Sequence, residues 1–227
     1  MTISRYNSAQ GNSEYQKGSR GLVLQNRQGI SLKKEMDRVE ASTLARAQQD
    51  SFDQLTARTR LTTRLICKLH RVWLGGIYEW AGRFRSVELA KGSFRWPPAM
   101  HVAQSMKTFE TTTLARLTPC RPASLETVSK ALAEVHGEFL LIHPFRDGNG
   151  RMARWLANLM AFQANLPAPD YRFTGRGSTS SRKKYLGGVI KAYAADYSLL
   201  TDFFVEAFER SLRLRTTTGF TNPRAPS

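Results

Sequence analysis

An apolar stripe from Leu125 to Ile142 constrains the fold more than any other feature of the 227-residue chain. Its members follow one another at alternating steps of three and four residues, the spacing of one helical face: they are Leu125, Val128, Leu132, Val135, Phe139 and Ile142. After a short break, residues 152–162 predict a second helix that is apolar nearly all round. Because such a helix packs at the centre of a domain, the chain is expected to be mainly α-helical around this helix–loop–helix.

The break between these two helices contains the sequence Gly148-Asn149-Gly150. Two glycines around an asparagine permit a loop in which successive backbone N–H groups point the same way. Such a nest at the N-terminus of a helix binds anions, most readily phosphate. As a turn alone Asp-Gly-Asn-Gly is common, so the residues around it decide how it is interpreted.

Charged residues suited to phosphate chemistry flank this loop. Arg151 and Arg154 are three residues apart, so they share a face of the following helix and suit a polyphosphate. Asp147 offers one carboxylate, the usual protein ligand of Mg²⁺ when phosphates supply the rest. His143 precedes the loop and is placed to remove a proton from an attacking group. These residues predict nucleotidyl or phosphoryl transfer.

The whole run His143–Arg154 resembles the signature of the Fic family, His-x-Phe-x-(Asp/Glu)-Gly-Asn-Gly-Arg-x-x-Arg, and matches it at every fixed position. Residues 80–85, Trp-Ala-Gly-Arg-Phe-Arg, resemble the Trp-Ala-Gly-x-x-Arg run that precedes the active-site hairpin of that family. The resemblance covers roughly residues 20–210. It implies a Fic-type helical bundle with a small β-hairpin flap beside the active site.

The resemblance also implies an activity, the transfer of AMP from ATP to a hydroxyl of a protein side chain. His143 would be the general base, and Asp147 would hold Mg²⁺ between the α- and β-phosphates. Arg151 would bind the β-phosphate and Arg154 the γ-phosphate, while the three loop residues cradle the α- and β-phosphates. Gly150 stands where Doc-type relatives, which phosphorylate, have lysine. Transfer from another nucleotide or phospho-donor stays open as an alternative.

Residues 87–96 alternate in polarity and predict a β-hairpin. An isolated hairpin is marginally stable unless it packs on something, so a structural appendage is one interpretation. The resemblance implies a flap whose edge takes the target segment as an added strand. The residues expected to contact the target are Val87, Leu89, Lys91 and Phe94.

Many Fic proteins are inhibited by a helix carrying Ser/Thr-x-x-x-Glu-Gly/Asn, whose glutamate pairs with the second arginine of the signature. Ser31–Glu35 matches this motif in part, but Met36 replaces its last position. Ser31 is equally an ordinary helix N-cap. We therefore expect inhibition in trans, by a small antitoxin-like partner of a toxin.

The sequence predicts a loosely ordered lead-in over residues 1–30, one Fic domain over 31–212 and a flexible tail over 213–227. Further helices are expected over 31–49, 62–74, 102–114, 185–195 and 199–212, with Ser124 capping the stripe helix and His70 and His136 in structural roles.

The net charge of +16 keeps a nucleic-acid-binding protein as an alternative, although no DNA-binding motif is evident. The densest basic cluster, Arg172–Lys184, is expected in a solvated loop. Neither an apolar run long enough to span a membrane nor a secretory signal is found, so a cytoplasmic protein is expected.

Overall fold

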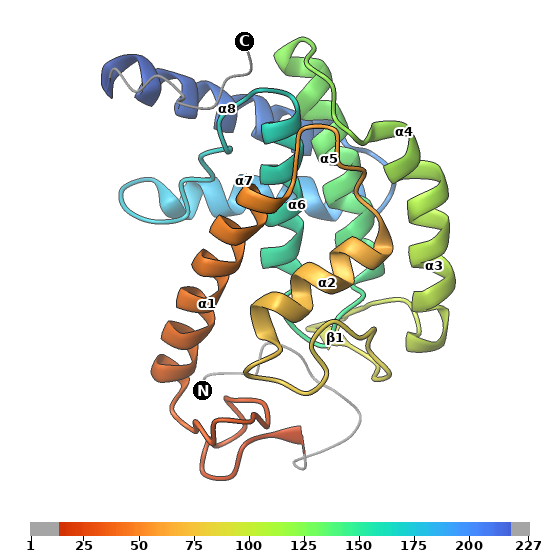
Figure 1. Cartoon of the computed structure of the whole chain (residues 1–227), viewed down its shortest axis with the longest axis vertical. Helices are drawn as coiled ribbons and strands as arrows, with labels where there is room; N and C mark the ends of the chain where they lie inside the picture. Colours follow the sequence, from red (N-terminus) through yellow and green to blue (C-terminus); the bar gives the residue numbers. More distant parts are fainter. Residues whose placement is uncertain (1–13, 219–227) are drawn as a thin grey trace. The chain divides into compact units, whose positions relative to one another are not determined.

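The computed structural model describes residues 14–218, with side chains described up to Leu214. The described chain is mainly helical with one two-stranded antiparallel hairpin, which confirms the predicted fold class (Figure 1). The order of elements is α1 (Lys33–Gln54), α2 (Thr63–Leu74), β1 (Ala90–Lys91), β2 (Phe94–Arg95), η2 (Ala99–His101), α3 (Val102–Phe109), the π-helical η3 (Glu110–Leu114), α4 (Ala115–Leu117), α5 (Leu125–Ile142), α6 (Asn149–Gln163), α7 (Ser178–Ala192) and α8 (Ser198–Thr218).

The described part of the chain divides into two compact units. The first contains the residues up to Leu55 together with Thr62–Glu110 and Ile142–Met152. The second contains Thr56–Leu61, Thr111–Leu141 and the residues from Ala153 onward. Helix α6 begins in the first unit and continues into the second.

In the first unit α1 and α2 pack on each other (Figure 1). Trp73 of α2 is buried, and its indole Nε1 donates to the main-chain oxygen of Glu40 in α1 over 2.9 Å. Thr62 caps α2, since its hydroxyl accepts the N–H of Leu65. The N-cap expected at Ser31 is wrong: α1 begins one residue later than that cap would place it, after Leu32, which makes no side-chain cap.

The predicted hairpin is present but short. Ala90 pairs with Arg95 and Lys91 with Phe94, around a turn in which Gly92 has φ +59°. Its own small apolar core consists of Val87, Leu89 and Trp96, all buried. The ring of Trp96 also lies 4.1 Å from that of His143, measured between centroids, which gives the hairpin the packing partner that an isolated pair of strands needs.

In the second unit Ser124 caps α5 as predicted, since its hydroxyl accepts the N–H of Thr127 over 3.2 Å. Helices α7 and α8 lie side by side (Figure 1). Gly188 allows this contact, because a Cβ there would lie 3.0 Å from the main chain of Leu200. Most of the apolar stripe of α5 is buried, with Val128, Leu132, Val135 and Phe139 almost fully enclosed.

The structure corrects the prediction made for the part of the basic cluster over residues 178–184. We expected a loop there, but α7 already begins at Ser178 and contains Arg182, Lys183 and Lys184. Arg182 lies 5.1 Å from the ring centroid of Phe173, and Lys184 forms an ion pair with Glu206 of α8. Packing of these long side chains onto the unit outweighs the turn preference of the Gly/Ser-rich sequence.

At the C-terminal end α8 continues to Thr218, beyond residue 212 where the helix was expected to end and into the tail expected from residue 213. Residues 1–13 of the expected lead-in and 219–227 of the expected tail lie outside the described residues. None of the described helices is both long and apolar enough to cross a membrane.

Candidate active site

The loop before α6 is held by the side chain of Asn149. Its Oδ1 accepts the N–H of Phe145 over 2.9 Å, and its Nδ2 donates to the carbonyl oxygen of Phe145 over 2.7 Å. Asn149 and Phe145 are both fully buried. The amide therefore fixes the loop, and only the main chain of Asn149 remains to face an anion.

Gly148 gives the loop its shape. Its φ is +86°, a region that L side chains rarely adopt, and a Cβ there would lie 2.8 Å from Cζ3 of Trp73. Its carbonyl oxygen accepts the N–H of Met152, the first bond of α6. The N–H groups of the first turn of α6 have no acceptor within the helix, so this end carries a partial positive charge.

His70 of α2 also holds the loop in place. Its Nδ1 accepts the N–H of Gly82, which leaves the proton on Nε2 to donate to the carbonyl oxygen of Asp147 over 3.1 Å. The imidazole stacks on Phe145, with ring centroids 3.8 Å apart. Burial lowers the pKa of His70 to about 4. A neutral histidine thus connects the Trp-Ala-Gly segment to the loop before α6.

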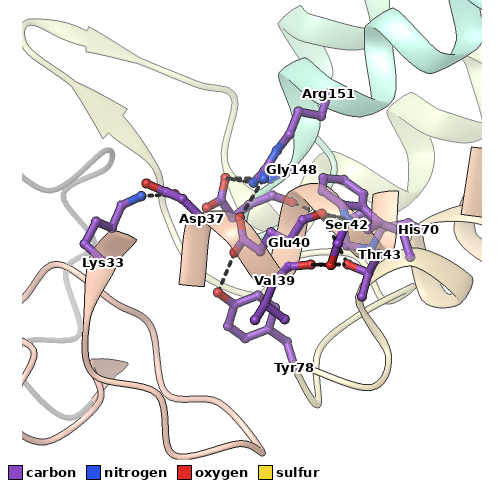
Figure 2. Close-up of polar contacts among 12 residues, drawn as sticks. Lys33, Asp37, Val39, Glu40, Ser42, Thr43, His70, Tyr78, Gly148 and Arg151 are labelled. Carbon is purple, nitrogen blue, oxygen red and sulfur yellow. Dashed lines mark hydrogen bonds and ion pairs between the residues drawn. The ribbon is translucent and has the colours of Figure 1, made fainter. Parts of the chain in front are cut away.

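Arg151 is held against Glu40 (Figure 2). Its Nη1 lies 2.6 Å from Oε2 of Glu40, and its guanidinium covers the ring of Trp73 at 4.6 Å from the centroid. Its Nη2 lies 3.9 Å from Oδ1 of Asp147, and within the described part of the chain it has no hydrogen-bond partner. The loop and the helix start therefore present one largely enclosed cation beside one carboxylate.

His143 adopts the left-handed backbone conformation, with φ +52°. Its main-chain oxygen accepts Nε of Arg85 over 2.8 Å, and its ring centroid lies 4.1 Å from that of Trp96. Arg85 also donates to the carbonyl oxygens of Val87 and Pro97, one at each end of the hairpin. The expected base and the expected flap are thus joined by one buried guanidinium.

The four residues expected to contact the target do not share one role. Val87 and Leu89 are buried in the core of the hairpin, together with Trp96. Lys91 and Phe94 are exposed at the strand ends beside the turn. Of these four side chains, Lys91 and Phe94 are therefore the accessible ones.

Arg154 belongs to the second unit. Its guanidinium lies 5.5 Å from the ring centroid of Phe173. Burial and the charge of Arg154 together lower the pKa of His136 to about 3, and Nε2 of His136 lies 2.7 Å from the hydroxyl of Tyr185. His136 is a buried structural residue, as expected from its position in α5.

Among the described residues no three His, Cys, Asp or Glu side chains group closely enough to hold a metal ion. Asp147 stands without other acidic or imidazole ligands, and its partly exposed carboxylate accepts the N–H of Gly148 through Oδ1. This arrangement fits Mg²⁺ of the kind that is bound by one carboxylate plus substrate phosphates. It does not fit a metal held by the protein alone.

Sequence reasoning missed Glu40, Trp73 and the connecting role of His70. A signal for Glu40 was available, because it lies four residues after Met36 on the face of α1 that is buried. A carboxylate on a buried helical face needs a cationic partner. The sequence alone does not reveal that this partner is Arg151, 111 residues away.

A sequence model of the Fic/DOC family matches residues 60–161, which contain the hairpin and the whole of the loop described above. Residues 60–161, a little under half of the chain, therefore match the Fic/DOC family. This confirms the resemblance drawn from the signature.

Three similar proteins illustrate the family. Protein adenylyltransferase VbhT of Bartonella schoenbuchensis is 29% identical over 132 residues, covering 58% of this chain and 27% of VbhT. The probable protein adenylyltransferase y4lH of Sinorhizobium fredii is 26% identical over 181 residues, covering 78% of this chain and 87% of y4lH. The crystal structure of BepC of Bartonella tribocorum with bound AMPPNP has a TM-score of 0.67 at 18% identity, covering 86% of this chain and 95% of BepC. The last likeness shows that the fold is that of a Fic domain.

Proposed function

We propose that this Fic protein transfers AMP from ATP to a hydroxyl of a target protein. The observation that carries the proposal is the largely enclosed Arg151 beside Asp147 at the start of α6. Its Nη1 contacts Glu40, while its Nη2 lies 3.9 Å from Oδ1 of Asp147 and has no hydrogen-bond partner among the described residues. A helix start, a fixed guanidinium and one carboxylate suit a polyphosphate with Mg²⁺. The names of VbhT and y4lH support the same activity.

In the proposed reaction the target hydroxyl attacks the α-phosphorus of ATP. His143 takes the hydroxyl proton, and its ring is kept in place by Trp96 and by the main-chain bond to Arg85. The bond between the α-phosphorus and the bridging oxygen breaks, so negative charge develops on the leaving pyrophosphate. Arg151 stabilises this charge at the β-phosphate and Arg154 at the γ-phosphate.

The main-chain N–H groups of Asn149 and Gly150 would hold the α- and β-phosphates at the start of α6. Asp147 would hold Mg²⁺, which neutralises phosphate charge when it is bound. Position 150 is glycine, whereas Doc-type relatives, which phosphorylate, have lysine there. The proposed product is therefore an AMP adduct on a serine, threonine or tyrosine.

Labelled ATP tests this proposal in a lysate that contains candidate targets. ATP labelled at the α-phosphate should label protein in the presence of Mg²⁺, whereas ATP labelled at the γ-phosphate should not. Label that comes only from the γ-phosphate would indicate phosphorylation and overturn the proposal.

We further propose that a small antitoxin-like protein regulates the activity in trans. Glu35, the candidate internal inhibitor, is exposed in the first turn of α1. Co-purification with a small partner that suppresses labelling would support this regulation. Full labelling activity in the presence of every small protein encoded beside this chain would contradict it.

A further inference from the structure

Glu40 is a buried carboxylate that contacts Arg151 in the candidate active site (Figure 2). Its Oε2 accepts Nη1 of Arg151, and its Oε1 accepts the hydroxyl of Tyr78, each over 2.6 Å. Its main-chain oxygen accepts Nε1 of Trp73 over 2.9 Å. Both oxygens of the carboxylate are thus engaged, and the backbone that carries them is fixed as well.

We propose that Glu40 is a positioning residue that holds the Arg151 guanidinium ready for the β-phosphate of the nucleotide. This inference rests on the proposed function and adds to it a residue outside the family signature. It assigns to α1 a part in nucleotide recognition, in addition to its packing on α2.

The geometry allows Glu40 and a phosphate to bind Arg151 at the same time. Nη1 faces Glu40, and the ring of Trp73 covers one face of the guanidinium. Nη2 lies on the side of Asp147, at 3.9 Å from its Oδ1, and is the nitrogen without a hydrogen-bond partner among the described residues. Nη2 is itself enclosed, so a phosphate would reach it by taking the place of Asp147 beside it. A guanidinium has five N–H donors in a planar fork, so a phosphate that does so can use Nη2 while Glu40 keeps Nη1.

Charge and rigidity give the contact its effect. A largely enclosed guanidinium without a counter-charge is costly, and Glu40 supplies a counter-charge that is itself almost fully buried. Arginine also loses considerable rotamer entropy when it is immobilised. Because Glu40 and Trp73 already restrain Arg151 in the nucleotide-free chain, less of that entropy is lost when the β-phosphate binds.

The test compares the affinities of AMP and ADP, measured by titration calorimetry on the full chain with Mg²⁺. The ratio of the two dissociation constants reports the β-phosphate contact and cancels general effects on folding. Glu40→Gln keeps the size of the side chain and can still accept the hydroxyl of Tyr78, but it removes the charge. We expect it to reduce the preference for ADP about tenfold, the scale of a hydrogen bond to a charged group.

Three comparisons make the result specific. Glu35→Gln, an exposed change in the same helix, should leave the preference for ADP unchanged. Tyr78→Phe removes the other bond to the carboxylate and should reduce the preference in the same direction, which provides a milder variant if Glu40→Gln does not fold. In an Arg151→Gln background, Glu40→Gln should change the preference no further, because its effect acts through Arg151.

The outcomes separate this inference from the proposed function. A wild type that binds ADP no better than AMP would overturn both. A clear ADP preference that Glu40→Gln leaves intact would overturn the positioning role alone. A preference that rises in Glu40→Gln would show that Glu40 competes with the phosphate for Arg151, and it would also overturn the positioning role.

Discussion

The imidazole of His70 donates through Nε2 to the carbonyl oxygen of Asp147, 3.1 Å away. The donor assignment follows from the other ring nitrogen, Nδ1, which accepts the N–H of Gly82. Only the neutral ring makes both bonds, because a protonated ring has no acceptor. The conformation of the Asp147 loop is therefore coupled to the protonation state of His70.

This coupling predicts acid sensitivity of folding. Burial lowers the pKa of His70 from 6.5 to about 4, so between these pH values the unfolded chain binds a proton that the folded chain does not. The contribution of the neutral His70 to the free energy of unfolding is complete above pH 6.5 and is lost as the pH falls toward 4. From pH 7.5 to 5 the loss from this group should be about 2 kcal/mol. Melting temperatures over this range measure it.

Two substitutions identify the group responsible. His70→Gln should lower the melting temperature at pH 7.5 and make its pH dependence less steep, leaving the part that comes from the buried His136. His101→Gln, at an exposed histidine, should change neither. A pH dependence that is equally steep in His70→Gln would assign the acid sensitivity to other groups.

Gly148 provides a prediction about the loop backbone. Gly148→Ala places a Cβ 2.8 Å from Cζ3 of Trp73 at a φ of +86°. We expect a loss of at least about 2 kcal/mol in the free energy of unfolding, together with loss of nucleotide binding. Denaturant unfolding and ADP titration measure the two effects.

The matched control is Gly187→Ala in α7. A Cβ at Gly187 meets no atom within 4 Å, and the residue lies inside a helix. This change should stabilise the protein by about 0.5–1 kcal/mol. If Gly148→Ala were as well tolerated as Gly187→Ala, the loop would not need the left-handed conformation.

The sequence predicted elements whose signal is local. The stripe of α5 and the spacing from His143 to Arg154 are read within single stretches of chain, and the structure places a helix and a helix-starting loop there. The hairpin was also located, and its alternation is confirmed, because Val87 and Leu89 are buried while Glu88 between them is exposed. Val87 and Leu89 pack with Trp96 in the hairpin itself and do not face outward.

What the sequence did not reveal depends on distant pairs. Glu40 meets Arg151 across 111 residues and Arg85 meets the carbonyl oxygen of His143 across 58, and no local pattern records either contact. The predicted start of α7 was wrong for a related reason. Contacts of Arg182 with Phe173 and of Lys184 with Glu206 support a helix in a stretch whose composition favours a loop.

Glu35 provides a prediction about regulation. Because its side chain is exposed and its motif is incomplete at Met36, we expect no internal inhibition from it. The purified wild type should modify itself with label from α-labelled ATP, and Glu35→Gln should do so to the same extent. Glu35→Gly should be no more active, and slightly less stable because glycine weakens a helix. A silent wild type beside a strongly active Glu35→Gly would show that the inhibitor is internal.

The most direct test of the account is tandem mass spectrometry of protein modified by this chain with ATP and Mg²⁺, comparing wild type with His143→Asn. Asparagine tolerates the left-handed conformation of His143, φ +52°, so the variant removes the base without straining the loop. We predict an AMP adduct on a hydroxyl side chain with wild type, and a rate reduced about 10²–10⁴-fold in the variant with ADP binding retained. A phosphate adduct, or AMP transfer at the wild-type rate by His143→Asn, would contradict the account.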